Sequence, residues 1–141
     1  MKKFELTRNA IAMHGKTLFQ IRAVSDFGCV KCGELGGYVE IERNLSQEGS
    51  ARVYGDAIIS RDARLFSERD YVTVKGFGRE NRHTTFFREK TGTIGVECGC
   101  FSGTIKEFKN QVKNTHGESR LGKEYLMLAD LIEYRLKNDK K

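Results

Sequence analysis

Several features that mark a membrane protein or a secreted protein are missing from this sequence. No apolar run approaches the roughly 20 residues that a helix needs to cross a bilayer. The N-terminus, Met1 to Arg8, lacks the apolar core of a signal peptide. Proline and tryptophan are absent altogether. We therefore expect a cytoplasmic protein without a membrane partner, whose thiols stay reduced.

Motifs that place catalytic groups are missing as well. His14, His83 and His116 lie in no H-E-x-x-H or H-x-E pattern, and no serine occupies a nucleophile elbow. The glycine-rich stretch from Ser25 to Gly37 does not contain the phosphate-loop pattern G-x-x-x-x-G-K-[ST], so its glycines are interpreted as turn residues. Carboxylates from distant positions could still pair, but the residues give no positive sign of an enzyme.

The length of 141 residues fits one compact domain, or two small modules that share a core. The net charge of +6 and the pI of about 9.2 favour an anionic partner, such as a nucleic acid, a nucleotide or a membrane surface. The 25 basic residues are interspersed with 19 acidic ones, which weakens this signal.

The four cysteines form two close pairs, Cys29-x-x-Cys32 and Cys98-x-Cys100. Together they could supply the four thiolates of a tetrahedral zinc site. The second pair has one intervening residue, where zinc knuckles have two or more. We therefore favour free, partly buried thiols, and expect no metal and no other cofactor.

The clearest pattern is a six-residue repeat from Val39 to Glu68. Its first positions are small or branched apolar residues, namely Val39, Leu45, Ala51, Ala57 and Ala63. This period fits a short left-handed β-helix, and the alternative is ordinary strands with polar turns every six residues. Five hexads make fewer than two coils, so other segments or another copy of the chain must cover the open ends.

The remaining chain predicts strands followed by helices. Strands are expected at 4–7, 17–24, 71–77, 83–89 and 93–98, the last three forming an antiparallel meander. Helices are expected from the capping box Thr104-x-x-Glu107 to His116, and from about Ser119 to Lys137. The prediction is an α+β fold with an N-terminal β segment at 1–69 and a meander packed with two helices at 70–141.

Residues suited to a nucleotide lie around the turn from Arg79 to Arg88. Guanidinium groups bind phosphate bidentately, amides and hydroxyls read ribose and base edges, and an aromatic ring stacks on a base. Phe86 and Phe87 point to opposite faces of their strand, so at most one is a core residue unless both faces are covered. The alternative is an exposed polar turn.

The first predicted helix carries one basic stripe, Lys106, Lys109 and Lys113. This stripe could face the phosphates of a ligand or simply the solvent. His116 stands before Gly117 at the end of the helix, where an imidazolium is favoured by the helix dipole.

Two parts of the chain resemble known phage families. The segment from Gly36 to Ala57, with Gly36-Gly37-Tyr38-Val39-Glu40, Asn44-Leu45-Ser46-Gln47-Glu48-Gly49 and Ala51-Arg52-Val53-Tyr54-Gly55-Asp56-Ala57, resembles the entry segment of phage and prophage hexapeptide-repeat proteins. Those proteins continue for many coils, whereas this repeat stops after Glu68. The resemblance therefore concerns architecture alone.

The second half, Tyr71 to Leu136, resembles the Thoeris anti-defence sponge family of phages. The motifs are Gly76-Phe77-Gly78, Asn81-Arg82-His83-Thr84-Thr85-Phe86-Phe87, Cys98-Gly99-Cys100-Phe101-Ser102-Gly103-Thr104, and Thr115-His116-Gly117 with Glu124-Tyr125-Leu126. The resemblance implies a non-enzymatic homo-oligomer that captures cyclic ADP-ribose-type signals made by bacterial TIR-domain proteins. It would act in the cytoplasm of the infected bacterium.

The candidate ligand-binding residues are Arg79, Asn81, Arg82, Thr85, Phe87, Arg88, Phe101, Lys109 and His116. In this hypothesis the three arginines hold a pyrophosphate, Asn81 and Thr85 read the ribose or base, and Phe87 or Phe101 stacks on a base. Two alternatives remain: an oligomerisation module without a ligand, and RNA or DNA binding with an affinity that falls steeply with salt.

Overall fold

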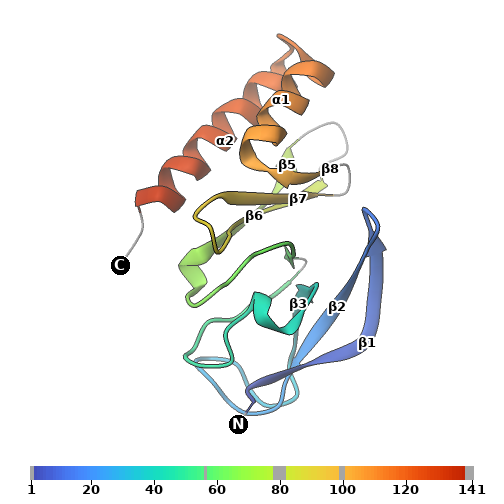
Figure 1. The fold of residues 1–141 in the computed structure, drawn as a ribbon, viewed down its shortest axis with the longest axis vertical. Coiled ribbons are helices and arrows are strands. Elements are labelled where there is room, and N and C mark those ends of the chain that lie inside the picture. Colours follow the sequence, from blue (N-terminus) through green and yellow to red (C-terminus); the bar gives the residue numbers. More distant parts are fainter. Residues whose placement is uncertain (1, 56, 78–81, 99–100, 139–141) are drawn as a thin grey trace.

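The computed structural model describes residues 2–55, 57–77, 82–98 and 101–138, apart from the side chains of Arg82 and Asn138. Two four-stranded sheets and two α-helices in this part of the chain make the predicted α+β fold. The helices cover one face of the second sheet, and the N-terminal half of the chain lies on its other side (Figure 1).

The first sheet has the order β1 (Phe4–Met13), β2 (Lys16–Ala23), β3 (Leu35–Val39) and β4 (Ile58–Ile59). β1 and β2 form a hairpin around His14 and Gly15, which both have positive φ (53° and 76°), as tight two-residue hairpins require. The two predicted strands are confirmed. β1 is longer than expected because Ala10 to Met13 continue to pair with β2.

The second sheet is an antiparallel meander of β5 (Tyr71–Phe77), β6 (Arg82–Arg88), β7 (Ile94–Cys98) and β8 (Phe101–Thr104). The three predicted strands are present. The fourth, β8, was not predicted, because its four residues carry no alternating pattern of their own and gain their hydrogen bonds from β7. β5 lies at the free edge of the sheet.

Both predicted helices are confirmed, as α1 (Ile105–His116) and α2 (Arg120–Asn138). Thr104 caps α1 by accepting a hydrogen bond from the Glu107 N–H, and the Glu107 carboxylate accepts from the Thr104 N–H. Gly117 ends α1 with a φ of 55°, a conformation in which a residue with a Cβ would be strained.

The six-residue repeat determines which side chains point inward. Every first position, from Val39 to Ala63, is at most 3% exposed. Tyr38 pairs in parallel with Ile58, and Leu45 with Leu65. Residues 20 positions apart therefore lie side by side on two successive passes of the chain. Regular strands are assigned in the described part of the repeat only to Val39 and to β4, and a left-handed β-helix is not shown.

Asn44 joins the two passes of the repeat. Its buried side-chain oxygen accepts hydrogen bonds from the N–H groups of Glu40 (3.1 Å) and Ile41 (3.0 Å). Its side-chain nitrogen donates to the carbonyls of Arg61 (3.3 Å) and Ala63 (3.1 Å) on the other pass. An amide at this sixth position of a hexad therefore satisfies main-chain groups that ordinary strand pairing leaves unpaired.

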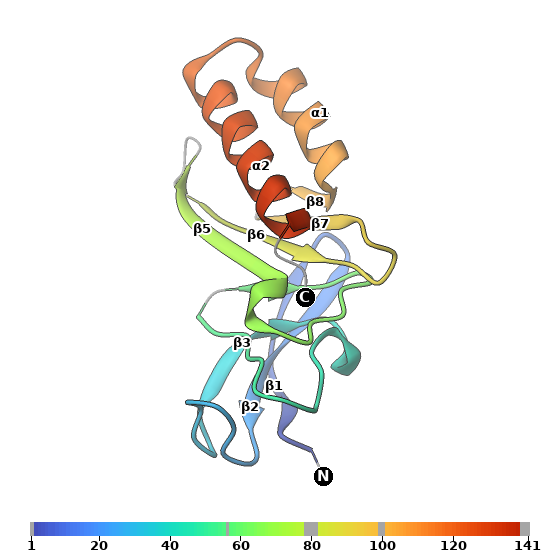
Figure 2. The same cartoon turned by 90° about the vertical axis from the view of Figure 1, so that its left-hand side faces the viewer.

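Both faces of the second sheet are covered. Phe86 packs against the helices, in a cluster with Phe108 and Tyr125. Phe87 points the opposite way and packs against the repeat, in a cluster with Ile59 and Leu65. Because both rings are fully buried, both phenylalanines are core residues, and the polar-turn alternative fails for them. Figure 2 shows the sheet between the helices and the N-terminal half.

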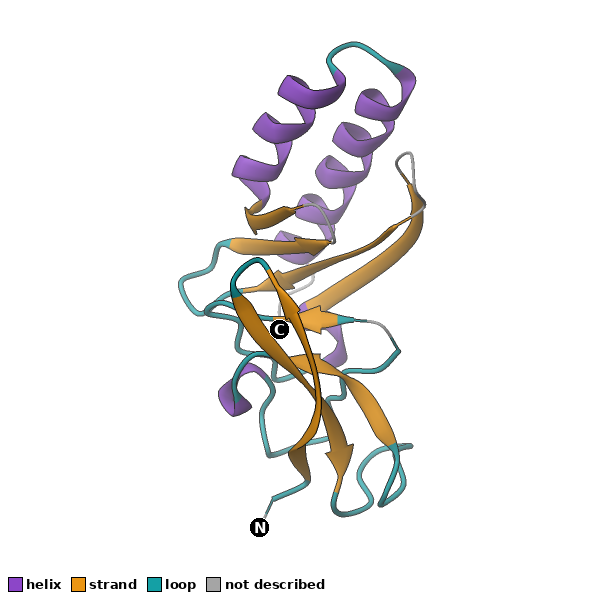
Figure 3. Ribbon diagram, turned by 90° about the vertical axis from the view of Figure 1, so that its right-hand side faces the viewer, coloured by secondary structure: helices purple, strands orange, loops and turns teal. Residues whose placement is uncertain are grey.

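A buried polar cluster, the Glu97 cluster, ties the tip of the β1–β2 hairpin to the second sheet. Its members are Lys16, Ser60, Glu97 and Ser102. Glu97 Oε2 accepts hydrogen bonds from Lys16 Nζ (2.5 Å) and from the hydroxyls of Ser60 (2.5 Å) and Ser102 (2.8 Å). Next to it, His14 Nε2 lies 2.8 Å from the Cys98 carbonyl oxygen. The hairpin tip therefore rests beside β7 and β8 (Figure 3).

Candidate functional site

The nine predicted ligand-binding residues do not converge on one site in the described part of the chain. Arg79 and Asn81 lie outside the described residues, and Arg82 is described only by its main chain, which pairs with Phe77. The other six divide between the two faces of the second sheet and the helices.

Thr85 and Phe87, two of the predicted ligand-binding residues, are buried and make internal contacts. Thr85 is 1% exposed, and its hydroxyl accepts a hydrogen bond from the N–H of Ile58 (3.2 Å). The Phe87 ring occupies the space above Gly95, where an added Cβ would lie 2.3 Å from a ring carbon. Neither side chain can contact a ligand without leaving the core.

Arg88, predicted to contact a pyrophosphate, makes internal hydrogen bonds. Its Nε and Nη2 donate to the carbonyl oxygen of Leu136, at 2.9 and 2.5 Å. Its Nη1 donates to Asp70 Oδ1 at 2.5 Å. Arg88 therefore binds a carbonyl in the last turn of α2, where a cation is favoured by the helix dipole.

Phe101, Lys109 and His116 lie on the helix side of the sheet and also make internal contacts. Phe101 packs edge-on against Phe108 at 5.6 Å, and the His116 ring lies 5.9 Å from the Tyr125 ring. Lys109 bonds the carboxylates of Asp130 (2.8 Å) and Glu133 (2.6 Å) on α2. Burial alone would lower the pKa of Lys109, but these two carboxylates raise it.

The three described cysteines do not lie together. Cys29 and Cys32 are exposed in the loop between β2 and β3, whereas Cys98 is buried in the other sheet. Cys100 lies outside the described residues. No group of three or more histidine, cysteine, aspartate or glutamate side chains in the described ranges could hold a metal ion. Neither of the described helices has the length and apolarity to cross a membrane.

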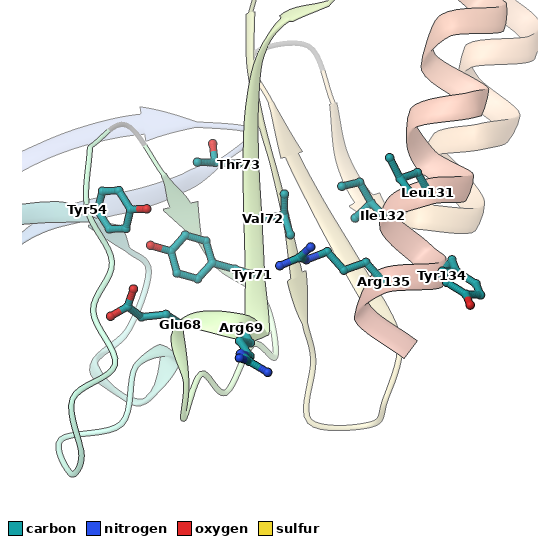
Figure 4. Close-up of a pocket in the computed structure, with 10 residues that line it drawn as sticks. All are labelled: Tyr54, Glu68, Arg69, Tyr71, Val72, Thr73, Leu131, Ile132, Tyr134 and Arg135. Atoms are coloured by element: carbon teal, nitrogen blue, oxygen red, sulfur yellow. The ribbon is translucent and has the colours of Figure 1, made fainter. Parts of the chain in front are cut away.

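A groove of about 840 Å³ opens along β5, between the repeat and the C-terminal half of α2 (Figure 4). It is lined by Tyr54, Glu68, Arg69, Tyr71, Val72, Thr73, Leu131, Ile132, Tyr134 and Arg135. Its volume falls within the range typical of sites for small molecules, about 300–1,000 Å³. We take this β5–α2 groove as the candidate functional site.

Two tyrosines form one end of the groove. Tyr54 and Tyr71 lie at 6.4 Å between ring centroids and meet edge to face, and the Tyr71 hydroxyl donates to the Arg52 carbonyl oxygen at 3.1 Å. The Arg52 guanidinium stacks on the Tyr54 ring at 4.5 Å. Burial, followed by the neighbouring Tyr54, raises the pKa of Tyr71, so its hydroxyl stays protonated and remains a donor.

Two arginines, Arg69 and Arg135, line the groove together with the acidic Glu68 and a set of mostly apolar residues, namely Val72, Leu131, Ile132 and Tyr134. Arg69 belongs to the short 3₁₀ helix η2 (Glu68–Asp70), and Arg135 lies in the last turns of α2. In Figure 4 the side chain of Arg135 extends from α2 toward β5. Both arginines are exposed. Guanidinium groups beside phenol rings can bind phosphate and stack on a base in one ligand.

The floor of the groove contributes main-chain groups. Three consecutive residues of β5, Tyr71 to Thr73, line it. Among the described residues β5 pairs with β6 alone, so the main-chain groups on its other side have no partner strand. Main-chain N–H and C=O groups, like polar side chains, can form hydrogen bonds with the edge of a base or with a hydroxyl.

The sequence reasoning did not identify these residues because they come from four separate elements. Tyr54, Arg69, Tyr71 and Arg135 share no motif, and the distance along the chain between Tyr54 and Arg135 is more than half of its length. Only the folded chain brings them together. A comparison with models of known protein families found no match, and a comparison with curated proteins found none either.

Proposed function

We propose that this protein binds a cyclic ADP-ribose-type nucleotide signal and sequesters it without degrading it, as a phage anti-defence sponge in the host cytoplasm. The observation that supports this proposal most is the β5–α2 groove, where guanidinium, phenol, hydroxyl and main-chain groups line one cavity. A cyclic ADP-ribose-type ligand offers what these groups bind: a pyrophosphate, ribose hydroxyls and an aromatic base.

In this proposal Arg69 and Arg135 hold the pyrophosphate, and Tyr54 stacks on the base. Thr73 and the free edge of β5 bind ribose or base edges. Sequestration needs only tight, slowly reversible binding, which many satisfied polar contacts in one cavity provide.

The repeat has a supporting role in this proposal. We infer that it is a short left-handed β-helix, because its first positions all point inward and its passes pair in parallel. It presents Tyr54 to the groove and closes the second face of the meander through the cluster around Phe87. Within the N-terminal segment at 1–69, it thus acts as a brace that joins the N-terminal strands to a ligand-binding module at 70–141.

Replacing Tyr54 with alanine should weaken capture of a cyclic ADP-ribose isomer. Loss of a base-stacking ring costs about 1–3 kcal/mol, which corresponds to roughly a 5- to 150-fold rise in Kd. Isothermal titration calorimetry with a panel of cyclic ADP-ribose isomers and cyclic oligonucleotides measures the change. Arg135→Gln should give a loss in the same direction.

The matched control is Arg120→Gln, on the same helix but outside the groove, with a side chain that is 81% exposed. Equal Kd values for Tyr54→Ala and the natural protein would contradict the assignment of the groove. An Arg120→Gln loss as large as the Arg135→Gln loss would show that only overall charge matters.

A release experiment separates capture from catalysis. The protein is incubated with the tightest-binding member of the panel, free ligand is removed, and the complex is heated. Mass spectrometry should then find the intact ligand in the supernatant. A chemically altered ligand would identify an enzyme, and binding of RNA or DNA with a steep loss of affinity in salt would identify a nucleic-acid-binding protein instead.

A further inference from the structure

The β5–α2 groove has an acidic group as well as basic ones. Glu68 belongs to its lining, although the proposed ligand carries a pyrophosphate that a carboxylate repels. The Glu68 side chain is exposed. The capping hydrogen bonds of η2 are accepted by the side chains of Ser67 and Asp70. These bonds do not involve the Glu68 carboxylate, so η2 forms without it.

The edge strand β5 divides the groove into two sides. Successive side chains of a strand point to opposite faces, and Tyr71 accordingly packs with the repeat while Val72 packs with the helices. Tyr54 joins Tyr71 on the repeat side, with 6.4 Å between their ring centroids. Arg135 lies on α2, on the helix side. A ligand that fills this groove therefore crosses β5, and its two ends meet different groups.

Glu68 lies with the two tyrosines. In Figure 4 its carboxylate is on the same side of β5 as the rings of Tyr54 and Tyr71, whereas Arg135 is on the other side. Burial raises the pKa of Tyr71 most, followed by Tyr54 and then by the Glu68 carboxylate, an effect that an anion exerts only at short range. The Tyr71 hydroxyl donates to the Arg52 carbonyl oxygen, so its proton is not directed at Glu68. One end of the groove thus combines aromatic rings with an anionic acceptor.

From this arrangement we infer that Glu68 selects the base of the ligand: its carboxylate accepts a hydrogen bond from the 6-amino group of a purine that stacks on Tyr54. The inference rests on the proposed function and names the base that the groove takes. An ionised carboxylate only accepts hydrogen bonds, so it pairs with the amino group of adenine and repels the 6-oxo oxygen of hypoxanthine or guanine. The same charge repels the pyrophosphate toward Arg135, so Glu68 also determines the direction in which the ligand lies across β5.

Isothermal titration calorimetry with two matched ligands tests the inference. One is the cyclic ADP-ribose isomer that binds most tightly in the panel, and the other is its hypoxanthine counterpart, in which an oxo group replaces the 6-amino group. The natural protein should bind the adenine form roughly 10- to 100-fold more tightly, the effect of one hydrogen bond to a charged group. Glu68→Gln should bring the two Kd values to within about threefold of each other, because an amide can accept from the amino group or donate to the oxo group.

Two further variants separate base selection from general binding. Arg135→Gln should weaken the binding of both ligands by the same factor and leave the ratio of their Kd values unchanged, because both carry the pyrophosphate. Glu118→Gln is the matched control and should change neither Kd, since Glu118 is exposed in the turn between α1 and α2 and lies outside the groove lining. Thermal unfolding followed by circular dichroism should give Glu68→Gln the same Tm as the natural protein.

Equal Kd values of the two ligands for the natural protein overturn the inference and leave the proposed function standing. A preference for the adenine form that survives Glu68→Gln also overturns it, because another group then reads the base. Failure of every member of the panel to bind contradicts the proposed function, and the inference with it. The failure of the inference and the failure of the proposed function are therefore distinguishable.

Discussion

Replacing Phe87 with alanine should lower the free energy of unfolding by about 3–5 kcal/mol, the range for truncating a fully buried phenylalanine. The ring is 0% exposed and packs in the core cluster that contains Ile59, Leu65 and Tyr71. It also fills the space above Gly95. Alanine would leave a cavity between the meander and the repeat, because two separate parts of the chain meet at this ring.

Urea unfolding followed by circular dichroism measures the change. Phe66→Ala is the control, since Phe66 is 69% exposed and its truncation should change the free energy of unfolding by less than about 0.5 kcal/mol. If Phe87→Ala instead leaves the free energy of unfolding unchanged and removes ligand binding, the prediction is contradicted. Phe87 then stacks on the ligand and does not stabilise the core.

Replacing Lys16 with methionine should cost a similar amount, about 3–5 kcal/mol, because it leaves the Glu97 carboxylate buried without its cation. Glu97 is 1% exposed, and its Oε1 has no hydrogen-bond partner among the described residues. Its Oε2 accepts hydrogen bonds from Lys16, Ser60 and Ser102. Of these three donors only Lys16 is charged.

The double variant Lys16→Met with Glu97→Gln tests the reason for that loss. Removing both charges should recover part of the stability, since a buried neutral amide costs much less than a buried carboxylate. Lys2→Met is the control: Lys2 pairs with Glu42 on the surface, and such pairs contribute about 0–1 kcal/mol. A double variant no more stable than Lys16→Met alone would show that packing of the lysine chain, not charge, holds the hairpin tip.

These two sites connect the N-terminal half to the second sheet, and the proposed groove depends on that connection. Tyr54 comes from the repeat, whereas Tyr71 and Thr73 come from β5. Their relative positions are set by the packing around Phe87 on one side of β4 and by the Glu97 cluster on the other. Loosening either contact should widen the groove as well as destabilise the fold.

Local sequence signals predicted the elements that form from local interactions. The capping box at Thr104 and the glycine at 117 mark the ends of α1. The first positions of the hexads predicted which side chains point inward. Each of these signals depends on residues within one or two turns of each other, so a single stretch of sequence contains all the information needed.

The contacts of the predicted site residues could not be read from the sequence, because they are made with distant segments of the chain. The polar, basic sequence around Arg88 predicted a phosphate ligand. In the structure Arg88 binds a carbonyl of α2 that lies 48 residues away along the chain. The sequence around Phe87 predicted an aromatic ring that is available to a ligand, but in the structure the repeat covers this ring. Strand β8 exists because β7 supplies its hydrogen bonds. The partner of each residue comes from a distant segment, which no local pattern reveals.

By itself, then, the sequence determined the α+β class, the apolar first positions of the repeat, and the positions of both helices and of three of the four meander strands. The tertiary structure alone decided that both faces of the second sheet are covered, that the predicted ligand residues Thr85, Phe87 and Arg88 are internal, and that a groove lined by tyrosine and arginine opens along β5. The physical reason is that periodicity and capping are local, whereas burial and convergence depend on contacts between segments that the sequence keeps apart.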